Sequence, residues 1–256
     1  MTSRWRSTWL LAAVFLCSLP AVTTRIYASD EVQYFSYLRS IWFDRDVSFE
    51  NEYRFFYDEG ITDSTGIHET FLERRTETGR RINFGTVGSA LLWAPFYAAT
   101  DWTLLALGRT DAPARRGLTH PYIAAVSYAS AVYGFLAVIC AAVLVRQVTG
   151  LGTWPAGIIW LGTPLLFYMY VAPPMSHACS AFAVSVFLLA WLRARTTWSA
   201  GWLAVLGVLA ALMAMVREQD AFVVAGPLVD FIWAFATRGA PVRLARNAAF
   251  GVIAGV

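Results

Sequence analysis

The sequence contains no lysine, so all 20 of its basic residues are arginine. Only 14% of the residues are charged, and a net charge of +3 is too small and too scattered to indicate a nucleic-acid partner. Cysteine is scarce as well. Cys17, Cys140 and Cys179 form an odd, dispersed set that excludes a disulfide framework and a zinc-binding spacing. We interpret them as small core residues.

The chain also lacks internal repeats, low-complexity tracts and a glycine-rich phosphate loop. What remains is strongly apolar: 57% of the residues are hydrophobic and the mean hydropathy is +0.51. A soluble domain does not reach this balance. The composition therefore predicts an all-α, polytopic transmembrane helix bundle.

Apolar runs near the length of a bilayer crossing recur along the chain. The first span is predicted at 9–26, although its basic start and short apolar run are also typical of a signal peptide. The later spans fall within 122–256: Tyr122–Val145, Trp154–Ala172, His177–Leu192, Ala200–Val216, Ala221–Ala236 and a last one from Asn247. Since the chain ends inside an apolar run, we expect residues 1–256 to be the N-terminal part of one larger transmembrane domain.

The segment Gly88–Leu107 is apolar enough to span, but Pro95 and Asp101 interrupt it. If it does not cross, most loop arginines share the cytoplasmic side with the N-terminus, as the positive-inside rule favours. These arginines are Arg146, Arg193, Arg195, Arg238, Arg243 and Arg246. We therefore expect 28–121 to form one large loop at the outer face, called the outer-face segment below. In it, Gly88–Leu107 would lie in or re-enter the interface.

Acidic residues are concentrated in this outer-face segment: 12 of the 17 lie between Asp30 and Glu77. Val32, Phe35, Leu38 and Trp42 recur there at helical spacing. They predict an amphipathic helix lying on the membrane, with Asp30 and Glu31 in its first turn and Ser29 or Asp30 as its cap.

Three polar points converge on the outer face in this topology. They are the pair Asp30-Glu31, His177 at the start of one span and Arg217 at the end of another. Carboxylates, a histidine and an arginine at one lipid–water boundary predict a site for a phosphate-bearing lipid. Arg80 and Arg81 are further candidates for binding phosphate.

Each candidate also has a purely structural interpretation. The carboxylates can cap a helix, and the histidine can bond a neighbouring carbonyl. Arg217 can snorkel to head groups or pair with Asp220. Arg80 and Arg81 can form a lipid-facing cationic patch. A solvated turn is the simplest interpretation of four further polar residues: Asp44, Asp46, Asn51 and Glu52.

An ordered set of motifs resembles the GT-C superfamily of membrane glycosyltransferases, which includes protein O-mannosyltransferases and aminoarabinose transferases. The resemblance covers essentially the whole chain and is greatest to an uncharacterised bacterial branch. The motifs are Ser29-Asp30-Glu31, Arg39-Ser40, Asp44-Arg45-Asp46, Asn51-Glu52-Tyr53, Leu91-Leu92-Trp93-Ala94-Pro95-Phe96, Gly162-Thr163-Pro164 and Ser176-His177-Ala178.

The resemblance implies transfer of a sugar from a polyprenyl-phosphate donor to an unidentified acceptor, at the periplasmic face of a bacterial inner membrane. On this interpretation Asp30 is the general base, and Glu31 is its partner or a ligand of a divalent cation. His177 and Arg217 bind the donor phosphate. No other cofactor is predicted.

Two other classes remain open. In a transporter or lipid flippase, the intramembrane Asp230 and the outer-face charges would line a pathway, although the inverted halves of many transporters are not evident. In a non-catalytic membrane scaffold, Asp30 could be replaced without consequence.

Overall fold

The computed structural model describes residues 3–60, 68–109, 111–112, 115–237 and 241–256. The chain is 77% helix, and its described part contains no β-strand, only an isolated bridge between Arg75 and Arg81. The predicted all-α class is therefore confirmed.

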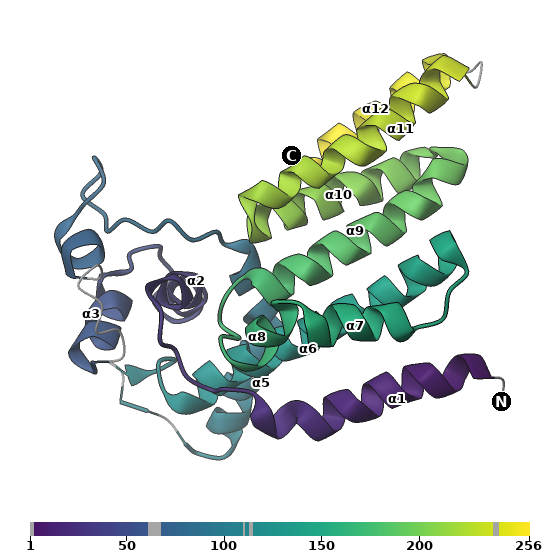
Figure 1. Cartoon of the computed structure of the whole chain (residues 1–256). Coiled ribbons are helices and arrows are strands. Elements are labelled where there is room, and N and C mark those ends of the chain that lie inside the picture. Colours follow the sequence, from purple (N-terminus) through teal and green to yellow (C-terminus); the bar gives the residue numbers. More distant parts are fainter. Residues whose placement is uncertain (1–2, 61–67, 110, 113–114, 238–240) are drawn as a thin grey trace.

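The helices form a bundle with a smaller cluster of elements at one end (Figure 1). The bundle consists of α1 (Ser3–Ser18), α6 (His120–Thr149), α7 (Trp154–Gly162), α9 (His177–Thr197), α10 (Ala200–Val216), α11 (Ala225–Thr237) and α12 (Pro241–Gly255). The cluster holds α2 (Ser29–Arg39), η2 (Ser40–Asp44), α3 (Glu50–Asp58) and η3 (His68–Glu73). Three further elements are η1 (Leu19–Ala21), α8 (Leu165–Tyr170) and η5 (Glu218–Val224).

Three helices in the described residues are long and apolar enough to cross a membrane: His120–Thr149, His177–Thr197 and the continuous Glu218–Thr237. Thr8–Ala21 and Ala200–Val216 are apolar but shorter. The chain thus has the helices of a membrane protein. Crossing by the remaining helices stays a prediction.

Two boundaries differ from the expected spans. The run Trp154–Ala172 is divided into α7 and α8, of 9 and 6 residues. Pro164 disfavours helical backbone at the preceding residue, and Thr163 accordingly has extended angles (φ −126°, ψ 169°). At the N-terminus, helical structure ends at Ala21 rather than 26, shortly after Pro20.

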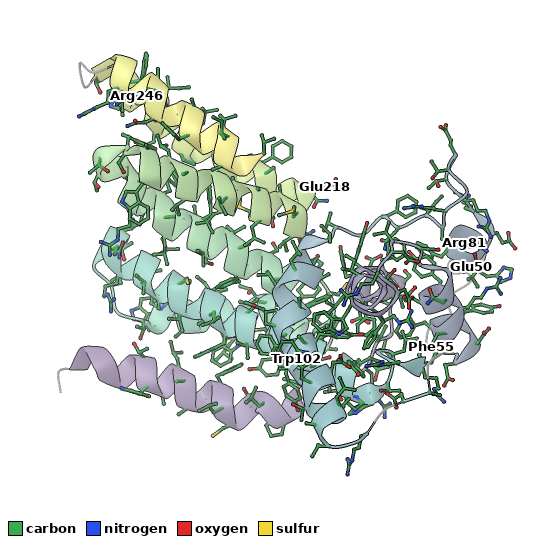
Figure 2. All side chains as sticks on the ribbon, turned by 180° about the vertical axis from the view of Figure 1, so that it is seen from behind. Glu50, Phe55, Arg81, Trp102, Glu218 and Arg246 are labelled. Atoms are coloured by element: carbon green, nitrogen blue, oxygen red, sulfur yellow. The ribbon has the colours of Figure 1, made fainter. Side chains whose placement is uncertain are left out.

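The two ends of the bundle differ in charge. The start of α1 and the loops after α6 and α9 lie at the end of the bundle far from α2 (Figure 1). Arg246 marks that end and Glu218 the opposite one in Figure 2. The loops that carry the arginines thus lie at one end of the bundle, with Arg238 outside the described residues. That this end is cytoplasmic stays a prediction.

Helix α2 departs from the expected amphipathic surface helix. Its apolar residues Val32, Phe35 and Leu38 are buried, but so are the polar Gln33 and Arg39. Neighbouring segments cover both faces and supply hydrogen-bond partners to the polar side chains. Viewed end-on in Figure 1, α2 is the centre of the outer-face cluster and does not lie on a flat surface.

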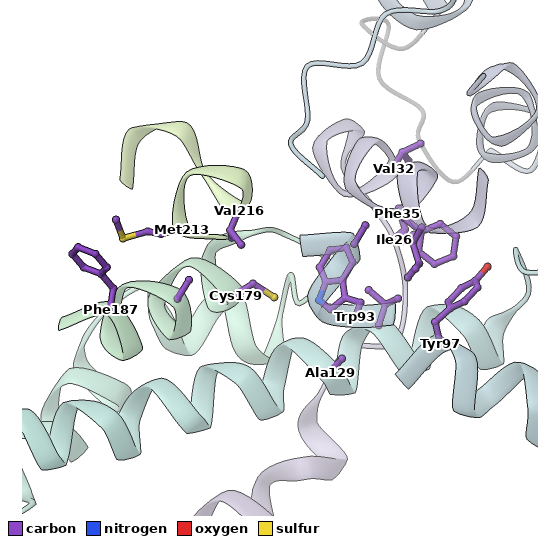
Figure 3. Packing of buried hydrophobic residues seen from close by; sticks show 14 of the residues in the cluster. Ile26, Val32, Phe35, Trp93, Tyr97, Ala129, Cys179, Phe187, Met213 and Val216 are labelled. Atoms are coloured by element: carbon purple, nitrogen blue, oxygen red, sulfur yellow. The ribbon is translucent and has the colours of Figure 1, made fainter. Parts of the chain in front are cut away.

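Helix α5 (Gly88–Ala106) joins this cluster to the bundle. Figure 2 shows it running across the ends of the bundle helices. Trp93 and Tyr97 of α5 belong to one continuous hydrophobic cluster that extends from Phe35 in α2 to Val216 in α10 (Figure 3). The outer-face segment and the bundle therefore share a core.

Glycines allow two close approaches between helices. A Cβ on Gly88 would lie 2.4 Å from the backbone of Met215 and Val216, so α5 begins against the end of α10. In the second contact, a Cβ on Gly207 of α10 would lie 1.9 Å from the carbonyl oxygen of Gly251 in α12. Small residues at helix contacts are typical of membrane bundles.

Gly88→Ala tests the first contact. The added methyl group meets backbone atoms, which cannot turn away as a side chain can. We expect unfolding to become easier by about 1–3 kcal/mol, the usual cost of overpacking. Thermal unfolding in detergent measures the change. Gly201→Ala in α10 is the matched control because its Cβ would meet nothing within 4 Å. Equal stability of the two variants would contradict the close contact.

Candidate functional site

The pair Asp30-Glu31 lies in the first turn of α2, but its members differ in environment. Asp30 is exposed and accepts a hydrogen bond from Gln33 Nε2 at 3.3 Å. Glu31 is only 1% exposed. Its Oε2 accepts hydrogen bonds from the backbone N–H groups of Tyr27 (2.7 Å) and Ala28 (3.0 Å). Glu31 thereby caps the helix, whereas Ser29 or Asp30 was the expected cap.

Burial raises the pKa of Glu31, against the lowering effect of these backbone bonds, and the nearby Asp30 raises it further. The Oε1 atom of Glu31 is buried without a hydrogen-bond partner in the structure. Of the two, Asp30 is the carboxylate that a soluble acceptor can reach, and Glu31 fixes the turn that presents it.

Arg217 lies close enough to His177 to act on it electrostatically. His177 begins α9, and its ring stacks on Tyr168 with 3.7 Å between ring centroids. Arg217 follows α10 and acts electrostatically on the His177 ring. One turn along α9, Ser180 Oγ donates to Asp220 Oδ2 at 2.6 Å.

Hydrogen bonds tie segment 84–86 to the start of α2 on one side and to Val216, at the end of α10, on the other. Gln33 donates to Asp30 through Nε2 and accepts at Oε1 from the backbone N–H of Phe84 at 2.7 Å. Two residues later, Thr86 Oγ1 donates to the carbonyl of Val216 at 2.7 Å. In the described residues no hydrogen bond or ion pair joins Asp30 directly to His177 or Arg217. Asp30 is therefore separate from the His177–Arg217 pair in the described contacts.

Arg80 and Arg81 lie elsewhere, in a separate ionic cluster. Arg81 is buried and binds Glu50 through Nε–Oε2 (3.2 Å) and Nη2–Oε1 (3.0 Å). Hydrogen bonds from Arg81 and then Arg54 lower the pKa of Glu50 to about 2. Arg80 is exposed and its charge reaches Asp46. Arg81 is thus held in a structural ion pair with Glu50. Of the two arginines, only Arg80 is exposed enough to bind a ligand.

The polar residues of the 39–53 region form a hydrogen-bonded network around buried Arg39 and Glu52, whereas Asp44, Asp46 and Asn51 are exposed, as in the expected solvated turn. Arg39, 4% exposed, binds both Asp44 and Glu52 through Nη1, the latter at 2.9 Å, and donates from Nε to the Arg116 carbonyl at 3.2 Å. Asn51 Nδ2 donates to Asp44 at 2.6 Å. The motifs Arg39-Ser40, Asp44-Arg45-Asp46 and Asn51-Glu52-Tyr53 thus come together in space.

The sequence analysis missed this network because the solvated-turn interpretation grouped the four polar residues without a buried basic partner. The sequence did contain a usable signal. Arg39 is the only basic residue within α2, and the spacing of apolar residues in α2 already predicted that one face of this helix is buried. A buried arginine needs acidic partners, and Asp44 and Glu52 are close in sequence.

Glu52 is the most perturbed acid in the network. Its side chain is fully buried and Oε2 has no hydrogen-bond partner in the structure. Burial raises the pKa of Glu52 to about 7, although the hydrogen bond from Arg39 lowers it.

The divalent cation left open by the resemblance does not fit Asp30 and Glu31. Glu31 gives one oxygen to backbone N–H groups and buries the other. In the described residues no group of three or more His, Cys, Asp or Glu side chains could hold a metal ion.

Arg39→Met tests the network. The change leaves Glu52 buried without its counter-ion and should cost about 3–5 kcal/mol of stability. Adding Glu52→Leu removes the stranded carboxylate, and we expect it to recover most of the loss. Thermal unfolding of both single variants and the double variant in detergent gives the coupling free energy between Arg39 and Glu52. Additive effects would contradict a direct pair.

Glu52 also predicts a pH dependence of stability. Between the unfolded pKa of 4.5 and the folded value of about 7, the folded state binds one proton more than the unfolded state. Its contribution to stability is therefore largest below pH 4.5 and falls as the pH rises to 7. Glu52→Gln should flatten the loss of stability between pH 5 and pH 8, measured by thermal unfolding. Glu218→Gln, an exposed carboxylate, is the control and should leave the slope unchanged.

Comparison with protein-family models, with curated proteins and with solved structures gives no match. The candidate site therefore stands on its geometry and on the motif resemblance.

Proposed function

We propose that this chain is the N-terminal part of a membrane glycosyltransferase that uses a polyprenyl-phosphate sugar, with Asp30 as the general base. The observation that carries the proposal is the exposure of Asp30 beside the buried Glu31, at the end of the molecule where His177 and Arg217 also lie. A reactive carboxylate and a cationic centre at one bundle end suit a lipid donor and an acceptor from water.

The chemistry assigns a separate task to each group. An acceptor hydroxyl must lose a proton as it attacks the sugar carbon, and a carboxylate within hydrogen-bond reach can take that proton. Gln33 holds the Asp30 carboxylate from one side through a hydrogen bond of 3.3 Å and leaves it exposed. Glu31 positions Asp30 by fixing the first turn of α2.

The leaving group is a phosphate bound to a lipid, and its charge grows as the bond to the sugar breaks. A guanidinium stabilises such charge through forked hydrogen bonds. Arg217 is the candidate for this task because it directly follows α10, at a helix end. His177, stacked on Tyr168, has a fixed ring plane and can donate one further hydrogen bond.

Asp230, the residue on which the transporter alternative depends, already has partners within the protein. Asp230 accepts hydrogen bonds from Trp191 Nε1 at 2.9 Å and pairs with Arg195 Nε at 2.9 Å. These contacts tie α11 to α9. A structural ion pair explains the intramembrane acid without a substrate pathway, so we favour the enzyme.

Asp30→Asn is the decisive change. Asn keeps the size of the side chain but cannot accept the proton, and loss of a general base costs about a hundredfold to ten-thousandfold in rate. Membranes from a strain that produces the variant in the full-length protein would be supplied with a panel of labelled polyprenyl-phosphate sugars. Release of the label from the lipid measures transfer to the acceptors that those membranes contain.

Asp58→Asn is the matched control, since it removes an exposed carboxylate from the same outer-face segment. It should retain normal transfer. If Asp30→Asn also transferred at the normal rate while the wild-type protein was active, Asp30 would not be the base. If no donor in the panel were consumed by the wild type, the enzyme class itself would be in error.

A further inference from the structure

A cavity of about 460 Å³ lies between the segment after η1, the end of α3 and the start of α6. Asp30, His177 and Arg217 do not line it. Its walls come from three parts of the chain that are far apart in sequence, so the fold creates the cavity.

The lining is rich in basic groups. Arg25, Arg115 and His120 all border the cavity, against a single acid, Glu59. Arg25 makes no ion pair with an acidic side chain that the structure describes. Arg115 pairs with Glu59 at 3.4 Å and lies over the Phe55 ring, 5.6 Å from its centroid. Even with neutral histidine the lining carries a net positive charge.

The N-terminus of α6 adds to this positive field. His120 is the first residue of the 30-residue helix, and its Nε2 is 2.9 Å from Thr24 Oγ1. The side chain of Thr119, the preceding residue, donates to Asp111 at 2.7 Å and makes no capping bond. The positive end of the helix dipole is therefore not neutralised by a side-chain cap.

The remaining walls are apolar. Ile26, Phe55, Leu118 and Ile123 line the cavity beside the basic groups. A free inorganic anion would gain nothing from them, whereas an anion with a hydrocarbon part would cover them. The cavity also adjoins the start of α6, a helix long and apolar enough to span a membrane. At the end of such a helix, the ligands nearest the cavity are lipid head groups.

We propose that this cavity binds the phosphate head group of an anionic phospholipid, with Arg25 and Arg115 as its cationic contacts. His120 is a further donor, and the helix dipole of α6 adds to the positive field. The apolar walls take the first carbons of the lipid chains. The site differs from the proposed donor site, and its test does not depend on sugar transfer.

Binding to the purified chain, in detergent and stripped of lipid, would be titrated by native mass spectrometry. The probes are dihexanoyl phosphatidylglycerol, dihexanoylglycerol without phosphate, and inorganic phosphate. Arg25→Gln and Arg115→Gln should each weaken phosphatidylglycerol binding about fivefold, the change expected for one arginine at a lipid surface. Arg74→Gln, an exposed arginine of the same outer-face segment, is the control and should change it less than twofold.

Arg25→Lys keeps the charge and should retain binding within about twofold, which separates lost charge from lost folding. The proposal also requires weaker binding of both other probes. Equal binding of dihexanoylglycerol would reduce the cavity to an apolar groove. Equal binding of inorganic phosphate would make it a simple anion site. Unchanged binding in both glutamine variants would place the lipid elsewhere. Each of these three results overturns the proposal.

Discussion

The arrangement of the outer-face segment depends on one buried guanidinium. Arg39 holds Asp44 of η2, Glu52 of α3 and the carbonyl of Arg116. The farthest of these partners lies 77 residues from Arg39 in the sequence. A charge in the core must be matched by opposite charge and hydrogen bonds, so few other packings of these segments are available. The direction in which α2 presents Asp30 follows from this constraint.

The helical class and the long apolar helices were predictable from the sequence because their signal is local. Apolar runs such as Tyr122–Val145 are uninterrupted, and backbone groups in lipid leave few options besides a helix. The failure at Trp154–Ala172 was also local: hydropathy gave one span, whereas Pro164 limits the backbone at Thr163. There the backbone restriction at the residue before a proline, and not the mean hydropathy of the run, determined the structure.

The site was predictable only in part. His177 and Arg217 could be brought together because each lies at the end of an apolar run, and the bundle aligns such ends. The separation of Arg81 from them could not be foreseen, since it depends on Glu50 and therefore on how α3 packs. Similarly, the spacing of apolar residues in α2 predicted its apolar face, but not the neighbouring segments that bury Gln33 and Arg39 on its other face. Tertiary partners decided both outcomes.

The contact of α10 with α12 has a consequence for biosynthesis. Gly207 approaches the backbone at Gly251, and Gly255 in turn lies close to Gly207. The glycine face of α10 therefore cannot be covered until the ribosome has added more than 40 further residues. At about 5–20 residues per second this delay lasts roughly 2–9 s. During that time the glycine face of α10 lacks the helix that covers it in the folded protein.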